Sequence, residues 1–166
     1  MPKTTSGDII FKGSCRCTAI QYTSTAAPSD ITLCHCHACQ HLSGSSYLPF
    51  IDIPRESFTY TSSSTLKTLK LSDVAERTFC SSCGTPITMA YAFDEKRISV
   101  TMGSIDMQSL ACEAPKVGQH IYLGEKAPWV VLPDDGAERW STQEMAHLIT
   151  FDSTAQGQGL EDLKIA

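Results

Sequence analysis

The sequence predicts a mainly β protein with a single helix near its C-terminus, and three observations support that fold class. Short runs rich in β-branched and aromatic residues recur over the first two thirds of the chain, and Gly, Pro and Ser separate them. Most of the cysteines fall in close groups on the turns between these runs. Only one segment, close to residue 145, repeats its apolar residues at helical spacing.

The predicted strands flank the cysteine groups. Asp8–Phe11 and Ala19–Thr23 lie on either side of a Gly-Ser-Cys-Arg-Cys turn and predict a hairpin. A second unit of strand, turn and strand covers Arg77–Tyr91 and returns over Ile98–Ser104. The remaining strand candidates are Ile31–Leu33, Ser46–Ile51 and Thr65–Leu71.

The helix is predicted by its N-terminal signal and its apolar stripe. Ser141 followed by Glu144 fits a capping box, and Met145, Leu148 and Ile149 then repeat at helical spacing. No repeat or linker divides the chain. We therefore expect one folded domain over residues 1–151 and a loosely packed tail over residues 152–166.

Composition excludes several classes of function. A chain of 166 residues with 42% apolar and 19% charged residues fits one folded domain. Its net charge of -5 and its lack of a Lys/Arg cluster argue against a nucleic-acid partner. It contains neither a signal-peptide pattern nor an apolar run of about 20 residues, which predicts no membrane partner. We expect a cytoplasmic protein, and the sequence makes no prediction of its oligomeric state.

Seven of the eight cysteines form three groups, which predict zinc sites. Because a reducing cytoplasm keeps thiols free, close cysteines there favour metal ligation over disulfides. Zinc prefers tetrahedral thiolate ligands, and two cysteines on one tight turn supply half a site. The groups are Cys15 with Cys17, then Cys34, Cys36 and Cys39, then Cys80 with Cys83 followed by Gly84.

The ligand count favours two zinc ions per chain. The first and third groups together give four cysteines, which is the ligand set of a closed structural site, and the middle group gives three, which is the pattern of an open catalytic site. Two alternatives stay open: the middle group could share two cysteines with an outer group, or His35, His37 or His41 could complete it. Taken alone, each of these histidines is expected to be a polar residue on an exposed loop. Cys112 has no ligand neighbour and is expected to be a small buried apolar residue.

An open site with three thiolates favours sulfur chemistry. Three thiolates and Zn²⁺ sum to a charge of -1, which makes the metal a poor activator of water and a good partner for a soft exogenous thiol. A thiolate held beside a small electrophile predicts thiol addition to an aldehyde, or the reverse carbon–sulfur cleavage. We expect a small-molecule thiol and a small carbonyl compound as partners.

Several motifs resemble the glutathione-dependent formaldehyde-activating enzyme family, which also includes centromere protein V. They are GSCRC, CHCHACQ, RTFCSSCGTPI, VTMGSID and HIYLGEKAPW, in the family's order between Lys12 and Trp129. The resemblance implies a β-tent fold of small antiparallel sheets, the same division of cysteine ligands, and a carbon–sulfur lyase that forms S-hydroxymethylglutathione from formaldehyde and glutathione. Gln40 and His41 stand where many members carry a basic pair.

Other residues receive weaker predictions. His37 or His41 is a candidate catalytic proton carrier, and Ser43–Ser45 are expected to form a plain turn. In the family-like segments, which include His120, we expect Tyr91 and Trp129 to be core aromatics, Arg77 to form a surface ion pair and Asp106 to cap a turn. The alternatives to a lyase are a non-catalytic zinc module that binds proteins, a related enzyme with a biosynthetic substrate, and a redox or metal sensor.

Overall fold

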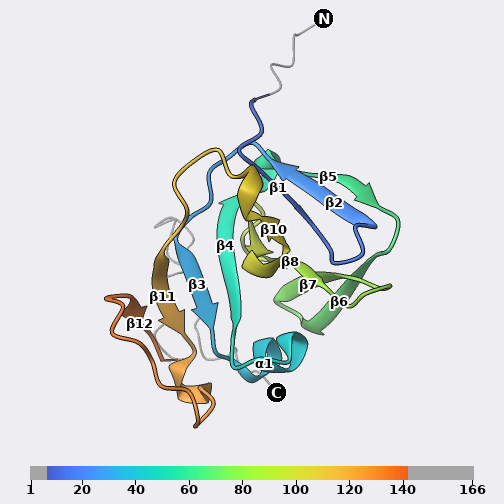
Figure 1. Cartoon of the computed structure of the whole chain (residues 1–166). Helices are drawn as coiled ribbons and strands as arrows, with labels where there is room; N and C mark the ends of the chain where they lie inside the picture. The colour runs from blue at the N-terminus through green and yellow to red at the C-terminus, as the bar shows by residue number, and fades with distance from the viewer. Residues whose placement is uncertain (1–6, 142–166) are drawn as a thin grey trace, which may run out of the picture.

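The computed structural model describes residues 7–141, which form two β-sheets and one α-helix (Figure 1). The mainly β prediction is therefore confirmed. The predicted helix after its Ser141 cap and the predicted tail over residues 152–166 lie outside the described residues. Within residues 7–141, no helix has the length and apolar character needed to cross a membrane.

The smaller sheet has four antiparallel strands in the order β10-β1-β2-β5. Their bounds are β1 Phe11–Ser14, β2 Ile20–Ser24, β5 Phe58–Ser63 and β10 Ile105–Asp106. Alternate side chains of β1 and β2 face the core, where Phe11, Ile20 and Tyr22 are buried. Gly13 lies directly under the Tyr22 ring, and a Cβ atom there would overlap that ring.

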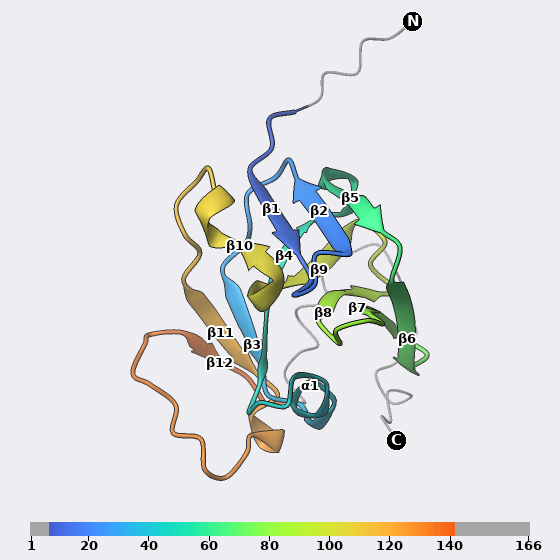
Figure 2. The same ribbon diagram turned by 45° about the vertical axis from the view of Figure 1, so that its right-hand side comes forward.

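The larger sheet has eight strands in the order β12-β11-β3-β4-β9-β8-β7-β6 (Figure 2). It is antiparallel from β3 to β6, whereas β11 runs parallel to both β3 and β12. The bounds are β3 Ile31–Cys34, β4 Leu48–Pro54, β6 Leu66–Ser72, β7 Ala75–Cys80, β8 Pro86–Tyr91, β9 Arg97–Thr101, β11 Val117–Ile121 and β12 Glu138–Arg139.

The larger sheet contributes to two separate cores. Along β4, Ile51 and Ile53 pack into a core shared with the smaller sheet, whereas Leu48 and Phe50 pack into a second core. The first core also contains Cys15 and Cys80, and the second contains Cys34 and Cys39. Because strand side chains alternate between faces, one central strand supports both cysteine-containing cores.

The only α-helix of the described residues, α1 (His37–Ser43), was not predicted. It has seven residues, too few to show a helical repeat in the sequence. The Cys36 side chain caps its N-terminus, and Gly44 ends it in the left-handed conformation with φ 63°. In both views α1 lies at the lower ends of β3 and β4 (Figures 1 and 2).

Four short 3-10 helices join the strands: η1 Arg55–Ser57, η2 Met102–Ser104, η3 Met107–Ser109 and η4 Leu123–Glu125. Asp106 caps η3, because its carboxylate accepts a hydrogen bond from the Gln108 backbone N–H at 3.1 Å. The predicted capping role of Asp106 is thus confirmed.

Candidate metal centres

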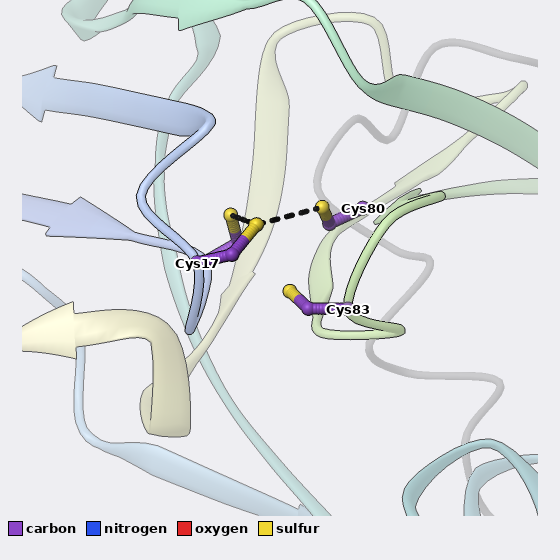
Figure 3. Close-up of side chains that lie close together, drawn as sticks. Cys17, Cys80 and Cys83 are labelled. Carbon is purple, nitrogen blue, oxygen red and sulfur yellow. Dashed lines mark hydrogen bonds between the residues drawn. The ribbon is translucent and has the colours of Figure 1, made fainter.

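Four cysteines from two distant turns converge between the sheets. Cys15 and Cys17 lie on the β1–β2 turn, and Cys80 and Cys83 lie on the β7–β8 turn. All four Sγ atoms lie within 4.8 Å of one another. The Sγ atom of Cys17 is 3.5 Å from that of Cys15 and 3.7 Å from that of Cys80 (Figure 3). We call these residues the four-cysteine group.

The two turns of this group have closely related geometry. The backbone N–H of Cys15 donates to the Ile20 carbonyl at 3.0 Å, and that of Cys80 donates to the Thr85 carbonyl at 2.9 Å. Each turn therefore closes five residues after its first cysteine. Each also needs one left-handed residue, and Thr18 (φ 62°) and Gly84 (φ 76°) supply it.

Neighbouring hydroxyl groups favour the thiolate form of two members of this group, Cys80 and Cys83. The hydroxyl of Thr85 lies 3.2 Å from the Cys83 sulfur and lowers the pKa of Cys83 to about 5. The hydroxyl of Thr65 lies 3.1 Å from the Cys80 sulfur and lowers the pKa of Cys80. Because the thiolate is the metal-binding form, the turns are arranged for ligation.

The second group, called here the three-cysteine group, is built locally around the start of α1. Cys34 ends β3, Cys36 caps α1 and Cys39 lies within it. Their Sγ atoms also lie within 4.8 Å of one another, with 3.5 Å between those of Cys34 and Cys36. Within residues 7–141, no further His, Cys, Asp or Glu ligand atom joins the group.

The donor chemistry of both groups fits zinc. A tetrahedral site with zinc–sulfur bonds of about 2.3 Å places its sulfurs about 3.8 Å apart, close to the separations of 3.5–3.7 Å found here. A disulfide needs about 2.05 Å, and all eight cysteines are free. In the three-cysteine group, the hydrogen bond between Cys34 and Cys36 lowers the pKa of Cys36 well below its usual range and raises the pKa of Cys34. Both groups can therefore hold a metal ion.

The three histidines near this group occupy different places. His35 was expected on an exposed loop but is fully buried, because its ring packs beside Tyr47 and against His120. His37 is 72% exposed, and its Nδ1 atom lies 3.5 Å from a Glu125 carboxylate oxygen. His41 is exposed near the end of α1. None of the three joins the cysteine sulfurs.

A buried chain of three side chains fixes the segment between Cys34 and Cys36. The Nε2 atom of His35 lies 3.2 Å from Nδ1 of His120, and Nε2 of His120 lies 2.9 Å from the Asp135 carboxylate. Because the carboxylate accepts the Nε2–H of His120, Nδ1 of a neutral His120 accepts the Nε2–H of His35. Burial lowers the pKa of His35 to about 4, which keeps that ring neutral. We call these three residues the His–His–Asp brace.

Aromatic side chains border the three-cysteine group. Tyr91, Tyr122 and Trp140 pack, partly buried, against the core that contains Cys34 and Cys39. Tyr122 has a left-handed backbone (φ 59°, ψ 41°), which costs about 1–2 kcal/mol for a residue with a side chain. The expectation for Tyr91 as a packed aromatic agrees with this position.

Gln40 and Ser43 have structural contacts. The Gln40 side-chain amide donates to the backbone carbonyls of His35 at 2.6 Å and of Glu125 at 2.9 Å, which ties α1 to η4. Ser43 was expected in a plain turn but is the last residue of α1, where its hydroxyl donates to the Cys39 carbonyl at 2.8 Å; the turn begins at Gly44. Gln40 therefore joins two backbone segments.

Three other expectations are wrong. Trp129 is 74% exposed, because it lies on an irregular loop after η4 where only its indole N–H has a partner, the Ser46 hydroxyl at 3.2 Å. Cys112 is exposed on the loop that precedes β11. Arg77 forms no ion pair with any described residue, and its Nε atom is buried without a hydrogen-bond partner.

Sequence reasoning missed Tyr122 and the brace. His35 lies between two predicted ligands, and His120 lies in a motif that resembles the family, so both carried a partial signal. Asp135 carried none, because an Asp between Asp134 and Gly136 in a polar loop is most often a surface residue. These residues become recognisable only when the fold brings β3, β11 and β12 together.

Comparisons with known proteins agree with this site. The family model for the glutathione-dependent formaldehyde-activating enzyme matches residues 10–125, which include all seven grouped cysteines. The chain belongs to this family.

Two individual proteins are also similar. An uncharacterized lyase of Schizosaccharomyces pombe is 28% identical over 81 residues, which cover 49% of this chain and 58% of that protein. The match therefore spans less than two thirds of the curated relative. The crystal structure of a Rhodobacter sphaeroides protein matches with a TM-score of 0.49 and 15% identity, over 78% of this chain and 99% of that one.

Proposed function

We propose that this protein is a zinc-dependent enzyme of the carbon–sulfur lyase type, which joins a small thiol to a small carbonyl compound and splits the adduct again. The family suggests formaldehyde and glutathione as the pair, with S-hydroxymethylglutathione as the product. The observation that carries the proposal is the three-cysteine group. It offers three thiols beside partly exposed aromatic residues and gains no fourth ligand from residues 7–141.

The two groups take different roles in this proposal. Cys15, Cys17, Cys80 and Cys83 hold a structural zinc that joins the two sheets, and Cys34, Cys36 and Cys39 hold the catalytic one. Bound by three thiolates, zinc supplies a soft Lewis-acidic position that favours a thiol as its thiolate. The partly buried rings of Tyr91 and Tyr122 restrict water at the same position.

Proton transfer is assigned to the start of α1. His37 directly follows Cys36, and its exposed ring contacts the Glu125 carboxylate. An exposed imidazole there can take the proton that the thiol loses and pass it to solvent. His41, one helical turn later, is the second candidate. A cytoplasmic location agrees with eight free cysteines.

Exchange NMR on a mixture of formaldehyde and glutathione tests the proposal directly. We expect the metal-loaded protein to accelerate exchange between free and adduct species, and Cys36→Ser to abolish the acceleration. Cys112→Ser is the matched control, because Cys112 is exposed and outside both groups; it should behave as wild type. In the same assay His37→Gln should slow exchange more than His41→Gln.

The outcomes separate the fold from the substrate. No acceleration with two metal ions bound per chain would remove formaldehyde and glutathione and direct the assay to other thiols and carbonyl compounds. Full activity in Cys36→Ser would contradict the proposed catalytic site itself.

A further inference from the structure

Tyr122 has an unusual backbone conformation beside the three-cysteine group. It follows β11 with φ 59° and ψ 41°, and among the described residues only Thr18 is another non-glycine with positive φ. Successive side chains of a strand point to opposite faces. Ile121 and Tyr122 nevertheless both pack against the core that contains Cys34 and Cys39. The left-handed turn is what directs the second of these side chains to the cysteines.

Backbone hydrogen bonds on both sides of Tyr122 stabilise its strained conformation. The backbone N–H of His35 donates to the Ile121 carbonyl at 3.0 Å, and that of Leu123 donates to the Trp140 carbonyl at 3.0 Å. One residue further back, His120 belongs to the His–His–Asp brace. Because β3 and β11 lie side by side in Figure 1, the same contacts position Cys34, Cys36 and Tyr122 together. Strain maintained in this way is typical of functional sites.

The Tyr122 hydroxyl is available to a ligand. It makes no hydrogen bond to any described residue, and although the side chain is partly buried, the hydroxyl oxygen is not among the atoms sealed from solvent. A phenol whose ring is fixed and whose O–H has no protein partner is a preorganised hydrogen-bond donor.

We propose that Tyr122 is a catalytic residue whose hydroxyl donates its proton to the carbonyl oxygen of the substrate. This inference rests on the proposed function. The thiol loses its proton to the proposed base, His37 or His41, or to solvent. Its sulfur then forms a bond to the carbonyl carbon, and the C=O π pair moves to the carbonyl oxygen. That oxygen takes the Tyr122 proton, and the tyrosinate regains one from water. The sum is RSH + R′CHO → RS–CH(OH)–R′, and the reverse sequence cleaves the adduct.

Two neighbouring groups are weaker candidates for this role. Tyr91 also packs against the cysteine core, but its ring stacks on Phe93 with centroids 4.9 Å apart and its backbone is an ordinary strand, so no strained conformation holds it there. The Arg77 Nε atom is buried without a hydrogen-bond partner, and Arg77 has no phenolic proton to donate. Tyr122 alone combines backbone strain, a free hydroxyl and contact with the cysteine core.

The test is Tyr122→Phe, which keeps the ring and removes only the hydroxyl. On the metal-loaded protein we expect kcat for thiol–aldehyde exchange to fall about 100-fold with little change in KM, as for loss of a general acid. Tyr47→Phe is the matched control, because Tyr47 packs beside His35 and lies outside the cysteine core. It should retain full activity.

A binding measurement gives a second readout. Adding the equilibrium mixture of formaldehyde and glutathione should perturb the tyrosine near-ultraviolet difference spectrum of wild type and of Tyr47→Phe but not of Tyr122→Phe. Wild-type kcat in Tyr122→Phe, or an unchanged spectral response, would overturn the role of Tyr122 and leave the proposed function standing. No acceleration by wild type with any thiol and aldehyde would overturn both.

Discussion

The two cysteine groups differ in how the chain assembles them. The four-cysteine group joins two turns that lie 63 residues apart between Cys17 and Cys80, and both its turns use the same five-residue closure. The three-cysteine group comes from six consecutive residues at the junction of β3 and α1. A site that links distant strands must hold the fold together, whereas a local site with three ligands can be left incomplete. This difference supports the proposal that the four-cysteine group has a structural role and the three-cysteine group a catalytic role.

The largest expected difference between the groups is in folding. Cys83→Ser should unfold the domain, because structural zinc contributes about 10–16 kcal/mol in small zinc modules, comparable to a whole domain's stability. Cys36→Ser should stay folded and bind one metal ion fewer. Circular dichroism with metal analysis measures both effects. Equal unfolding of the two variants would remove the distinction.

The His–His–Asp brace should matter only to the three-cysteine group. His120→Phe leaves His35 and Asp135 without their partner and should lower the free energy of unfolding by about 2–3 kcal/mol. Metal affinity at this group should fall about 10–100-fold, as when outer-shell partners of ligands are removed. Chelator competition resolves the two sites. An equal loss of affinity at both would show that the brace acts on the whole fold; exposed His41→Phe is the control.

In the smaller sheet, a substitution should lower the stability of the protein without changing its catalytic activity. Gly13→Ala forces a Cβ atom into the Tyr22 ring and should cost about 1–3 kcal/mol of stability without changing kcat. Gly103→Ala has open space at its Cβ position and should be neutral. Thermal denaturation beside the exchange assay checks both variants, and a fall in kcat for Gly13→Ala would link the two regions.

The smallest expected effect is the pH dependence of the brace. The hydrogen bond from His120 lowers the pKa of Asp135 below its unfolded value of about 3.9. The carboxylate therefore contributes stability above that pH, and the contribution is lost as pH falls through the folded pKa. The stability difference between wild type and Asp135→Asn, from urea unfolding with excess zinc, should narrow below about pH 4. A stability difference that stays constant with pH would contradict the contact between the Asp135 carboxylate and His120.

Local features of this molecule were predictable from its sequence. Each cysteine pair lies within a few residues on a turn, so ligand spacing is visible without the fold, and so are the strands that flank each turn. The short length of α1 hid it, because seven residues do not establish a helical period.

Long-range features were not predictable. The parallel pairing of β3 with β11 and the contact between His35 and His120 join residues about 85 positions apart. Burial of His35 follows from that pairing, and so does the position of Tyr122. The sequence pattern therefore indicated which residues hold the metal, whereas the groups proposed to act beside it depend on tertiary structure.

The most direct test of one closed and one open site is ¹¹³Cd NMR of the cadmium-loaded protein. We expect two resonances per chain. Added 2-mercaptoethanol should shift one of them and leave the other unchanged, and the sensitive resonance should be absent in Cys36→Ser. Two resonances whose chemical shifts both stay unchanged when the thiol is added, or a single resonance in wild type, would contradict the presence of one closed and one open site.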